Sequence, residues 1–540
     1  MGSSVFRFLN TESKSLVGAA AIVGGLSFAS RIVGLVRDRI LLGEFGAGNV
    51  LDAYYAAFKL PDLLFSLLVI GSLSAGFIPI FTKHWHAIGE KEKAWKFTNN
   101  ALNIIAAGMA AISLVVLAFA GPVAGLIAPG FDAVKRGMVE DFTRVMLLAE
   151  FILALSVVFG SVLQGMKRFL LFSLAPILYN VGIIVGALVF VKWFGPIGLA
   201  WGVVLGAGLH FFVQLYGVLS AGYRYRPVLN HTDKDVRELA ALTGPRMLGI
   251  AVGQVDFMVL TILATTLAAG SVTIFQVAYN IQYFVAGIVG VSFAIAAFPT
   301  LSEAAEKKDN EHFINTFEHA VRQALFFSIP LMVVFLVLRA QIVRVVAGAG
   351  AFDWTATRLA ADTLAFFTLS FVPQCLTFIL ARAFFALRDS MTPLTMGIVS
   401  TVLSLVSGLY FSHTLGVMGM AIAFTIGAFA DVALLWVPLR QRLGTLHEYR
   451  ILRALYVMAF AGLGCAVTTQ VLKPIITRVI SLDTFLGVLT QGLIAGGAGI
   501  GVYVLISYGL KSEDLAQAMA GIRRRVMRKA NPVETIPVGE

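Results

Sequence analysis

The chain has 540 residues, of which 58% are hydrophobic and 13% are Asp, Glu, Lys or Arg, against roughly 25% charged residues in soluble proteins. A soluble fold of this size could not bury so much apolar surface, so the composition excludes an ordinary water-soluble enzyme, a disordered chain and a collagen-like one. The net charge is +11, which we interpret as the Lys and Arg that membrane proteins collect in cytoplasmic loops, in preference to a nucleic-acid surface.

The apolar residues form long segments without charge, over 97–131, 257–302 and 390–430. Each segment exceeds the ~20 residues that a helix needs to cross a bilayer, and the strict alternation of a β-barrel is absent. We therefore predict an all-α, polytopic integral membrane protein. The expected transmembrane helices number fourteen, over 15–43, 49–82, 97–120, 139–165, 169–192, 196–222, 237–268, 271–301, 311–338, 355–386, 391–411, 415–440, 450–473 and 484–509.

The loops and the tail indicate an orientation. Lys and Arg gather in alternate loops, which favours a cytoplasmic N-terminus, a cytoplasmic C-terminus and an even number of helices. The segment 512–529 reads as a short basic amphipathic helix at the membrane surface. The first apolar segment carries several charges and is no signal-peptide core. The two cysteines, Cys375 and Cys465, lie in apolar segments and are interpreted as packing residues, with neither a disulfide nor a metal site.

An internal repeat is visible at an offset of about 220 residues. The sequence Gly-x-Ala at 198–200 with Gly206-Ala207 matches 419–421 with Gly427-Ala428, and the stretch at 48–56 matches 270–278. The repeat pairs the first six helices with the next six, both starting on the same side of the membrane. Such parallel repeats are typical of transporters, with the substrate path between the lobes. We expect an N-lobe over 1–230, a C-lobe over 231–445, two further helices over 446–510 and a cytoplasmic basic tail over 511–540.

Charges inside apolar helices are the candidate site residues, because a charge at membrane depth costs at least ~2.5 kcal/mol unless it faces water or a partner. The first helix holds Arg31, Arg37 and Asp38, with the two arginines on different faces. Arg31 is interpreted as a substrate contact; Arg37 and Asp38 fit either a substrate contact or ion pairs with other helices. The second helix holds Asp52 and Lys59 on one face, and Pro61 is expected to kink or break it. The alternative for Asp52 is a helix cap near the outer surface.

Buried acids in the later helices indicate a cation site. Asp256 and Asp431, helped by Thr425 or Gln254, could hold Na⁺ or a proton as the coupling ion; the alternative is two hydrogen-bonded structural acids. His210 occupies the repeat position of Asp431 and is interpreted as a packing residue. Motifs for ATP hydrolysis or soluble-type catalysis are absent from the sequence, and no other cofactor is expected. Arginines in a cavity suit an anionic ligand, because guanidinium pairs well with phosphate oxygens.

Several motifs resemble those of the MurJ/MviN family of lipid II flippases, within the multidrug/oligosaccharidyl-lipid/polysaccharide exporter superfamily. They are Ser30-Arg31-x-x-Gly34-x-x-Arg37-Asp38, Phe45-Gly46-Ala47-Gly48 with Asp52-Ala53, 57–64 (AFKLPDLL), 71–79 (GSLSAGFIP), Arg168-Phe169 before Ala175-Pro176 and Asn180, Gly244-Pro245, and 382–386 (RAFFA) before Asp389 and Thr392-Pro393. The resemblance spans about residues 15–510. It implies fourteen helices and export of the undecaprenyl-pyrophosphate-linked peptidoglycan precursor by alternating access, driven by the membrane potential or a cation gradient.

The resemblance also implies a bacterial inner membrane, a lipid-linked anionic glycan as substrate, no enzymatic activity, cell-wall synthesis proteins as partners and a monomer. Arg31, Arg37, Asp38 and Asp52 match its substrate-binding positions, and we add Ser30, Lys59, Arg246 and Asn280 to the expected substrate-binding residues. The chain departs from the family pattern in four places: Phe65 and Ser66 replace two arginines, Ile70 replaces an acid, and Tyr279-Asn280 replaces an arginine. Arg246 is the candidate to compensate. The departures leave three alternatives open: another polyprenyl-linked glycan, a drug or polysaccharide exporter, and a transport-inactive scaffold.

Overall fold

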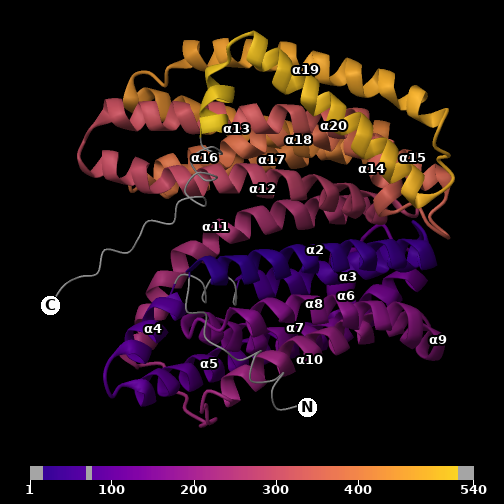
Figure 1. The fold of residues 1–540 in the computed structure, drawn as a ribbon. Coiled ribbons are helices and arrows are strands. Elements are labelled where there is room, and N and C mark those ends of the chain that lie inside the picture. The colour runs from indigo at the N-terminus through magenta and orange to yellow at the C-terminus, as the bar shows by residue number, and fades with distance from the viewer. Residues whose placement is uncertain (1–15, 68–75, 521–540) are drawn as a thin grey trace. The chain divides into compact units, whose positions relative to one another are not determined.

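The computed structural model describes residues 16–67 and 76–520, leaving aside the side chains of 16–21, 244–246, 248–252 and 284. In this described part all regular structure is helical (Figure 1). The helices are α2 (Leu16–Phe45), α3 (Asn49–Phe65), α4 (Ile78–His86), α5 (Lys91–Ala118), α6 (Ala120–Ile127), α7 (Ala133–Gly165), α8 (Phe169–Val185), η3 (Gly186–Phe190), α9 (Val191–Phe194), η4 (Gly195–Ile197), α10 (Gly198–Leu219), α11 (Lys234–Ala264), α12 (Ser271–Glu306), α13 (Asn310–Val337), α14 (Arg339–Val346), α15 (Trp354–Thr368), α16 (Phe371–Ala386), α17 (Met391–Leu415), α18 (Val417–Leu443), α19 (Glu448–Thr477) and α20 (Phe485–Gly509).

Helix is present in every predicted range, which confirms the all-α membrane fold. Nine of the described helices are long and apolar enough to span a membrane, or ten if the pair α15 and α16, bent by 42°, counts as one span. The number of fourteen crossings stays a prediction. The expected break at Pro61 is wrong: α3 continues through the proline to Phe65, as membrane helices permit when neighbouring groups satisfy the freed backbone. The tail is helical over 513–520, and its remainder lies outside the described residues.

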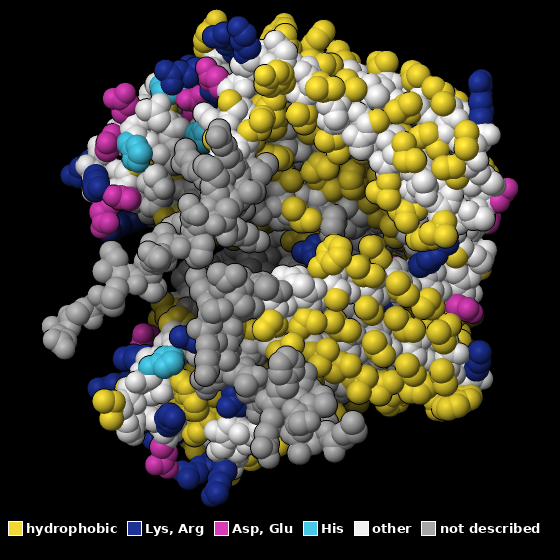
Figure 2. Space-filling view, in the orientation of Figure 1, with side chains coloured by type: hydrophobic (Ala, Val, Ile, Leu, Met, Phe, Trp, Pro, Cys, Tyr) yellow, Lys and Arg dark blue, Asp and Glu magenta, His cyan; other side chains and the backbone are white. Residues whose placement is uncertain are grey.

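The apolar surface of these helices is arranged for lipid. In α17 only 17% of the most apolar window is buried, and Val402, Val406 and Leu409 of that helix are each more than half exposed. Figure 2 shows hydrophobic side chains along the lengths of the helices, with charged side chains gathered mainly toward helix ends. Exposed apolar surface on this scale would be costly in water, so the surrounding solvent of the helices is the bilayer.

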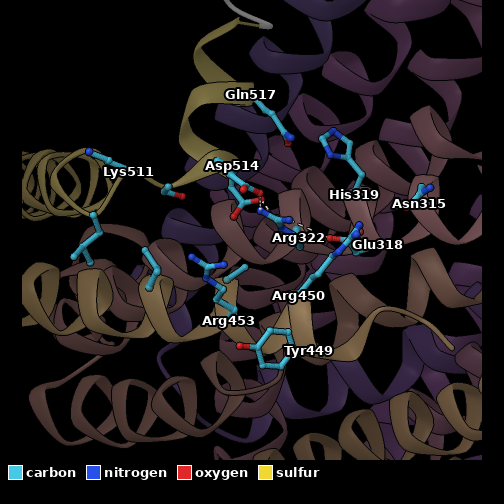
Figure 3. Close-up of a pocket in the computed structure, with 15 residues that line it drawn as sticks. Asn315, Glu318, His319, Arg322, Tyr449, Arg450, Arg453, Lys511, Asp514 and Gln517 are labelled. Atoms are coloured by element: carbon cyan, nitrogen blue, oxygen red, sulfur yellow. Dashed lines mark hydrogen bonds and ion pairs between the residues drawn. The ribbon is translucent and has the colours of Figure 1, made fainter.

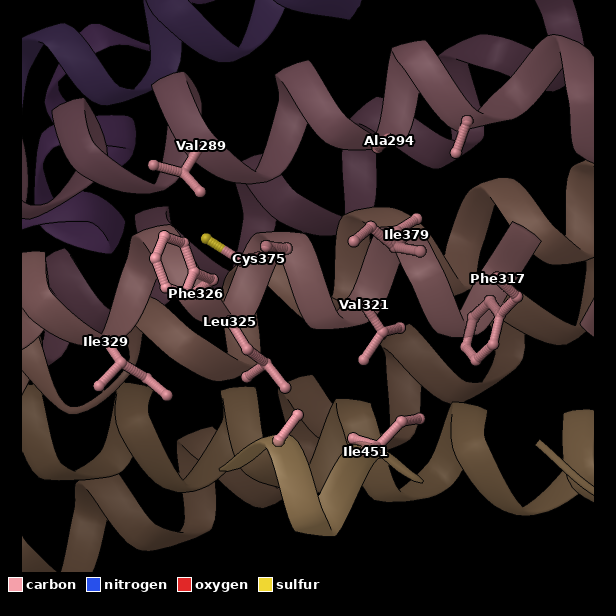
Figure 4. Packing of buried hydrophobic residues seen from close by; sticks show 14 of the residues in the cluster. Val289, Ala294, Phe317, Val321, Leu325, Phe326, Ile329, Cys375, Ile379 and Ile451 are labelled. Carbon is pink, nitrogen blue, oxygen red and sulfur yellow. The ribbon is translucent and has the colours of Figure 1, made fainter. Parts of the chain in front are cut away.

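The chain forms two compact units: unit 1 comprises 1–276, 346–357 and 408–420, and unit 2 comprises 277–345, 358–407 and 421–540. These units describe packing in this structure, whereas the predicted lobes rest on the repeat, and the lobe boundaries stay a prediction. Unit 2 has a core built on one stripe of α13, where Phe317, Val321, Leu325 and Ile329 recur every four residues (Figure 4). Cys375 of α16 is fully buried in this core and Cys465 is also buried, as expected of packing residues.

Glycines allow α8 and η3 to approach α10 closely in unit 1. A Cβ added at Gly182 would lie 2.2 Å from the backbone of Gly206, and one at Gly186 would lie 2.4 Å from Gly202. Small residues four apart on facing helices are the usual device for close packing in lipid, where the hydrophobic effect between helices is absent. Any larger residue at Gly182 or Gly186 would therefore force the two helices apart.

The contacts of Gly198 in α10 and of Gly419 in α18 recur at the repeat offset. A Cβ at Gly198 would meet the backbone of Phe190, and a Cβ at Gly419 would meet the backbone of Phe411. Gly198 precedes Gly419 by the same number of residues as Phe190 precedes Phe411. Equivalent sequence positions thus make equivalent helix contacts, which supports the predicted internal repeat.

Candidate functional site

Arg37 and Asp38 of α2 pair with each other, whereas the sequence left open a substrate contact or ion pairs with other helices. Nε and Nη2 of Arg37 donate to Oδ1 of Asp38 at 2.9 and 2.7 Å. In a third bond, Nη1 donates to Oδ1 of the neutral Asn180 in α8 at 2.9 Å, which is a hydrogen bond to another helix and no ion pair. A guanidinium has five N–H groups, so two remain after these bonds. Because 24% of the Arg37 side chain is exposed, those two can reach an anionic ligand.

The other predicted residues of α2 lie one to two turns away. Arg31 is exposed and Ser30 is half-buried. Asn180 is fixed in turn, because its Nδ2 donates to the carbonyl of Pro176 at 3.0 Å. The geometry therefore presents one exposed arginine and one oriented arginine along the same helix. Such an arrangement can bind a bulky anion through more than one of its oxygens.

Asp52 is held by four donors, all within unit 1. Its Oδ2 accepts from Nζ of Lys135 and from the amide of Gly270, each at 2.7 Å. Its Oδ1 accepts from the amide and the hydroxyl of Thr273 at 2.8 and 2.7 Å. The side chain is 1% exposed, so in this structure Asp52 ties α3 to α7 and α12, and its surroundings indicate a structural role in place of the predicted substrate contact.

Turn backbones pack tightly around this carboxylate. Gly270 has a φ of +89°, and a Cβ there would lie 2.6 Å from the carbonyl oxygen of Ala47. Gly46 has a φ of +64° and faces the carbonyl of Ala351, whose amide donates to Gly43 at 2.7 Å. Only glycine accepts both the left-handed backbone and the close approach at these positions. Gly46 and Gly270 are therefore needed for the turns at this end of unit 1 to pack this closely.

Lys59, a substrate contact predicted from the sequence, is buried in this structure. Its Nζ donates to Oε1 of Gln276 at 2.7 Å and lies 3.9 Å from the centroid of the Phe257 ring. The residue is 6% exposed. Asp52 and Lys59 share a helix but not a site: each has its own partners. The ammonium keeps two further N–H groups beside the Gln276 bond, but its burial restricts the access of an anion in this structure.

The proposed cation residues fall in different compact units, Asp256 in unit 1 and Asp431 in unit 2. Ser400 donates to Oδ1 of Asp431 at 3.4 Å, and Thr377 also bonds it. The two predicted helpers are engaged elsewhere, Thr425 with the carbonyl of Phe366 and Gln254 with Ser66. Among the described residues no three His, Cys, Asp or Glu side chains are grouped as a metal site would require.

Asp431 and His210 stand at equivalent positions of the repeat, and so do two of the residues that hydrogen-bond them. The hydroxyl of Ser156 in α7 lies 2.7 Å from Nδ1 of His210 in α10. Thr377, which bonds Asp431, stands at the repeat position of Ser156. Each unit thus carries a hydroxyl paired with a titratable side chain at this position of the repeat, a histidine in one unit and an acid in the other. The interpretation of His210 as a packing residue fits this single buried hydrogen bond.

Glu150 is a candidate that sequence reasoning missed. It lies in the middle of α7, is 2% exposed, and its Oε2 is buried with no hydrogen-bond partner among the described residues. A buried carboxyl group without a partner is costly inside a membrane helix, which marks Glu150 as a candidate functional residue. Asp62 of α3, which is exposed, and Tyr179 of α8 are within electrostatic range. The signal was available, since Glu150 interrupts an apolar segment.

Comparison with known proteins decides the family. A family model described as "Lipid II flippase MurJ" matches residues 43–487. The chain belongs to the MurJ family. It is 26% identical over 534 residues to the probable lipid II flippase MurJ of Vibrio cholerae, covering 94% of this chain and 99% of that one. It is 28% identical over 440 residues to the lipid II flippase MurJ of Burkholderia cenocepacia, covering 79% and 84%.

Solved structures show the same fold. A structure titled "Lipid II flippase MurJ, inward closed conformation" aligns with a TM-score of 0.72 at 22% identity, over 90% of this chain and 97% of that chain. An inward-facing multidrug resistance MATE family transporter of the MOP superfamily aligns with a TM-score of 0.65 at 16% identity, over 79% and 99%. This chain therefore has the fold that the MurJ structure shares with the MATE family transporter.

The departures from the MurJ pattern have structural counterparts. Phe65 packs against the apolar core of unit 1, and Ser66 is 5% exposed with its hydroxyl accepting from Gln254 at 2.9 Å. Asn280 is exposed on α12. Ile70 lies outside the described residues, and so does the side chain of Arg246, which leaves its compensating role a prediction. Where the family pattern has two adjacent arginines, this member has packed and hydrogen-bonded side chains.

Proposed function

We propose that this protein is a lipid II flippase, which moves the undecaprenyl-pyrophosphate-linked peptidoglycan precursor from the inner to the outer leaflet. The observation that carries the proposal is membership of the MurJ family over most of the chain. The site geometry supports it: Arg31 is exposed and Arg37 retains two N–H groups, the donors that a pyrophosphate requires. The protein is a transporter without catalytic activity, and it acts as a monomer beside cell-wall synthesis enzymes.

Alternating access is the proposed mechanism, with the repeat-related lobes opening first to one side and then to the other. Transporters of the same fold are known in an inward-facing and an outward-facing conformation, with TM-scores of 0.65 and 0.55 to this chain. We place the N- and C-termini in the cytoplasm of a bacterium on the basis of loop charge. Asp52 with Lys135, Gly270 and Thr273 holds one end of unit 1 closed in this structure.

The polyprenyl chain of the substrate needs an apolar path. Unit 2 has an apolar groove of about 650 Å³ lined by α13, α16 and α19, with Ile329, Val333, Val372, Leu455 and Gly462 among its residues. Because a polyprenyl tail remains in the lipid while its headgroup crosses, a groove open to the bilayer can hold part of it. This groove supports a lipid-linked substrate over a water-soluble drug.

A second candidate is favoured by Phe65 and Ser66. Two cations fewer next to the cavity would weaken binding of a pyrophosphate together with an acidic peptide, so another polyprenyl-linked glycan is the alternative substrate. Complementation separates the two. We expect the wild-type chain to rescue a bacterium depleted of its lipid II flippase, and Arg31→Ala and Arg37→Ala to abolish rescue while the variants insert normally.

Arg144→Ala is the matched control for these variants. Arg144 is half-exposed, pairs with Glu140 on the surface of α7, and should leave rescue unchanged because surface ion pairs contribute ~0–1 kcal/mol. Full rescue by the Arg31→Ala/Arg37→Ala double variant would refute the roles assigned to these arginines. Failure of a correctly inserted wild type, with transport of a different polyprenyl-linked glycan, would favour the second candidate.

We further propose that a cation gradient drives transport through Glu150, Asp431 or Asp256, with a proton or Na⁺ as the coupling ion. Glu150→Gln tests the first of these residues, because glutamine has the shape of the neutral acid but cannot exchange a proton. We expect folded protein, with stability within about 1 kcal/mol of wild type, and loss of the dependence of rescue on external pH. The measurement is complementation across a pH series, with Glu150→Asp as the variant that keeps a carboxyl group. An unchanged pH profile in Glu150→Gln would limit this residue to packing.

A further inference from the structure

A pocket of about 520 Å³ lies at one end of unit 2, where α13 and α19 begin and α20 ends (Figure 3). The chain closes the pocket by a sharp reversal after α20. Lys511 takes a left-handed φ of +52°, and the amide of Ser512 donates back to the carbonyl of Ser507 at 2.9 Å. Helix 513–520 then forms one wall of the pocket.

Arg322 binds the acids of this pocket by hydrogen bonds. Its Nη1 donates to Glu318 at 3.0 Å, its Nε to Asp514 at 2.9 Å and its Nη2 to Glu513 at 3.0 Å. Arg322 is 12% exposed, and Glu318 and Asp514 are still more buried. One guanidinium thus engages all three carboxylates that line the pocket, and with four Lys and Arg against three acids the lining keeps a net positive charge.

Three cations remain on the lining: Arg450 and Arg453 of α19, and Lys511. Arg450 reaches Glu318 only at 3.5 Å. Arg453 and Lys511 make no ion pair with any residue that the structure describes. Arg450 and Arg453 are three residues apart and so share a face of the helix. Figure 3 shows them on α19 beneath Arg322 and Asp514, with Lys511 on a separate segment.

The surface beside the pocket is apolar and aromatic. Leu452 is 58% exposed, Tyr456 83%, Tyr508 70% and Leu510 48%. These residues lie in the first turns of α19 and at the end of α20, the level at which membrane helices meet the headgroups. Tyrosine and leucine side chains at that level are what lipid headgroups and the adjoining parts of the acyl chains meet in other membrane proteins.

We propose that this pocket binds the phosphate of an anionic phospholipid from the leaflet on the basic side of the membrane. The phosphate would lie between Arg450, Arg453 and Lys511, and the acyl chains along the exposed face of α19 and α20. Guanidinium matches phosphate in a bidentate geometry, and lysine adds a point charge. Free phosphate shares the headgroup's chemistry, but only a lipid also uses the apolar flank. The proposal does not depend on the proposed transport function.

Native mass spectrometry of the full chain tests the proposal. The protein is released from nanodiscs that contain phosphatidylglycerol in phosphatidylcholine, and the retained anionic lipid is counted as a function of its fraction. We expect Arg453→Gln/Lys511→Gln to weaken retention about 25-fold, since each basic residue near anionic lipid contributes about fivefold. Both side chains are exposed, so the variant keeps its core.

Arg478→Gln is the matched control, because Arg478 is exposed at the opposite end of the same helix. It carries the same kind of charge change and should retain the lipid like wild type. Equal retention by wild type and the double variant would overturn the proposal. The wild type in phosphatidylcholine nanodiscs is also titrated with inorganic phosphate. Phosphate binding as tight as the binding of phosphatidylglycerol would overturn a lipid ligand and leave a phosphate site. Because no readout involves transport, the outcome is separate from that of the complementation test.

Discussion

Asp52→Ala should destabilise the protein by about 3–5 kcal/mol, the cost of leaving a buried cation without its partner. Lys135 is 6% exposed on its side chain, and Asp52 is the acid that binds it. The variant also removes the acceptor for Gly270 and for both donors of Thr273. Thermal unfolding in detergent, followed by loss of the folded monomer in size-exclusion chromatography, measures the effect.

The double variant Asp52→Asn/Lys135→Met separates charge from packing. It removes both charges, and the asparagine carbonyl still accepts from Thr273. We expect it to recover most of the stability, because an ion pair replaced by neutral groups of similar size is often tolerated while half of one is not. A double variant as unstable as Asp52→Ala would show that the buried charge of Lys135 is not the cause.

Arg322→Ala should release helix 513–520 from unit 2. The variant leaves Asp514, 3% exposed, without its partner, at a cost of about 3 kcal/mol or more. Undocking a short terminal helix costs less than unfolding the bundle, so the response is local. Hydrogen exchange at 512–520 should rise strongly while the core of α13 and α16 stays protected. Lys307→Ala, which removes an exposed pair with Glu303, should change neither. Unchanged protection at 512–520 in Arg322→Ala would contradict the docking role.

The same contact predicts a pH dependence. Hydrogen bonding from Arg322, followed by its charge, lowers the pKa of Glu513 below the ordinary value of 4.5. The carboxylate form is the one that binds Arg322, so its contribution is complete above pH 4.5 and is lost as the pH falls through the lowered pKa. Protection factors at 512–520, which correct for the slower intrinsic exchange in acid, should therefore fall as the pH is lowered for the wild type and much less for Glu513→Gln.

The helices and the class of protein could be predicted from the sequence because the signals are local. Apolar runs longer than a bilayer is thick, bounded by glycine and charge, give the helices directly, and the repeat follows from spacing. The partners of charged residues could not be predicted, because they depend on packing: Asp52 and Lys135 are 83 residues apart, and Arg37 and Asn180 are 143 apart. Nothing local distinguishes an Asp52 held by four donors from one that faces a ligand.

Glu150 is a different kind of omission. Its position within an apolar segment is a sequence-level signal equal to that of Asp256 or Asp431. Phe65 and Ser66 show the opposite case. The sequence indicates that cations are missing there, and the structure adds that the positions are filled by packing and by a hydrogen bond to Gln254.

The partners of Asp52 are synthesised at different times. Lys135 emerges from the ribosome with α7, long before Gly270 and Thr273 exist. An early membrane intermediate of the first helices can therefore already bury Asp52, because the ion pair with Lys135 satisfies its charge. The later segment then adds three neutral donors to a carboxylate that is already in place. Lys135 thus allows the first half of the chain to insert with this acid at its final depth, and the second half locks to it as it is made.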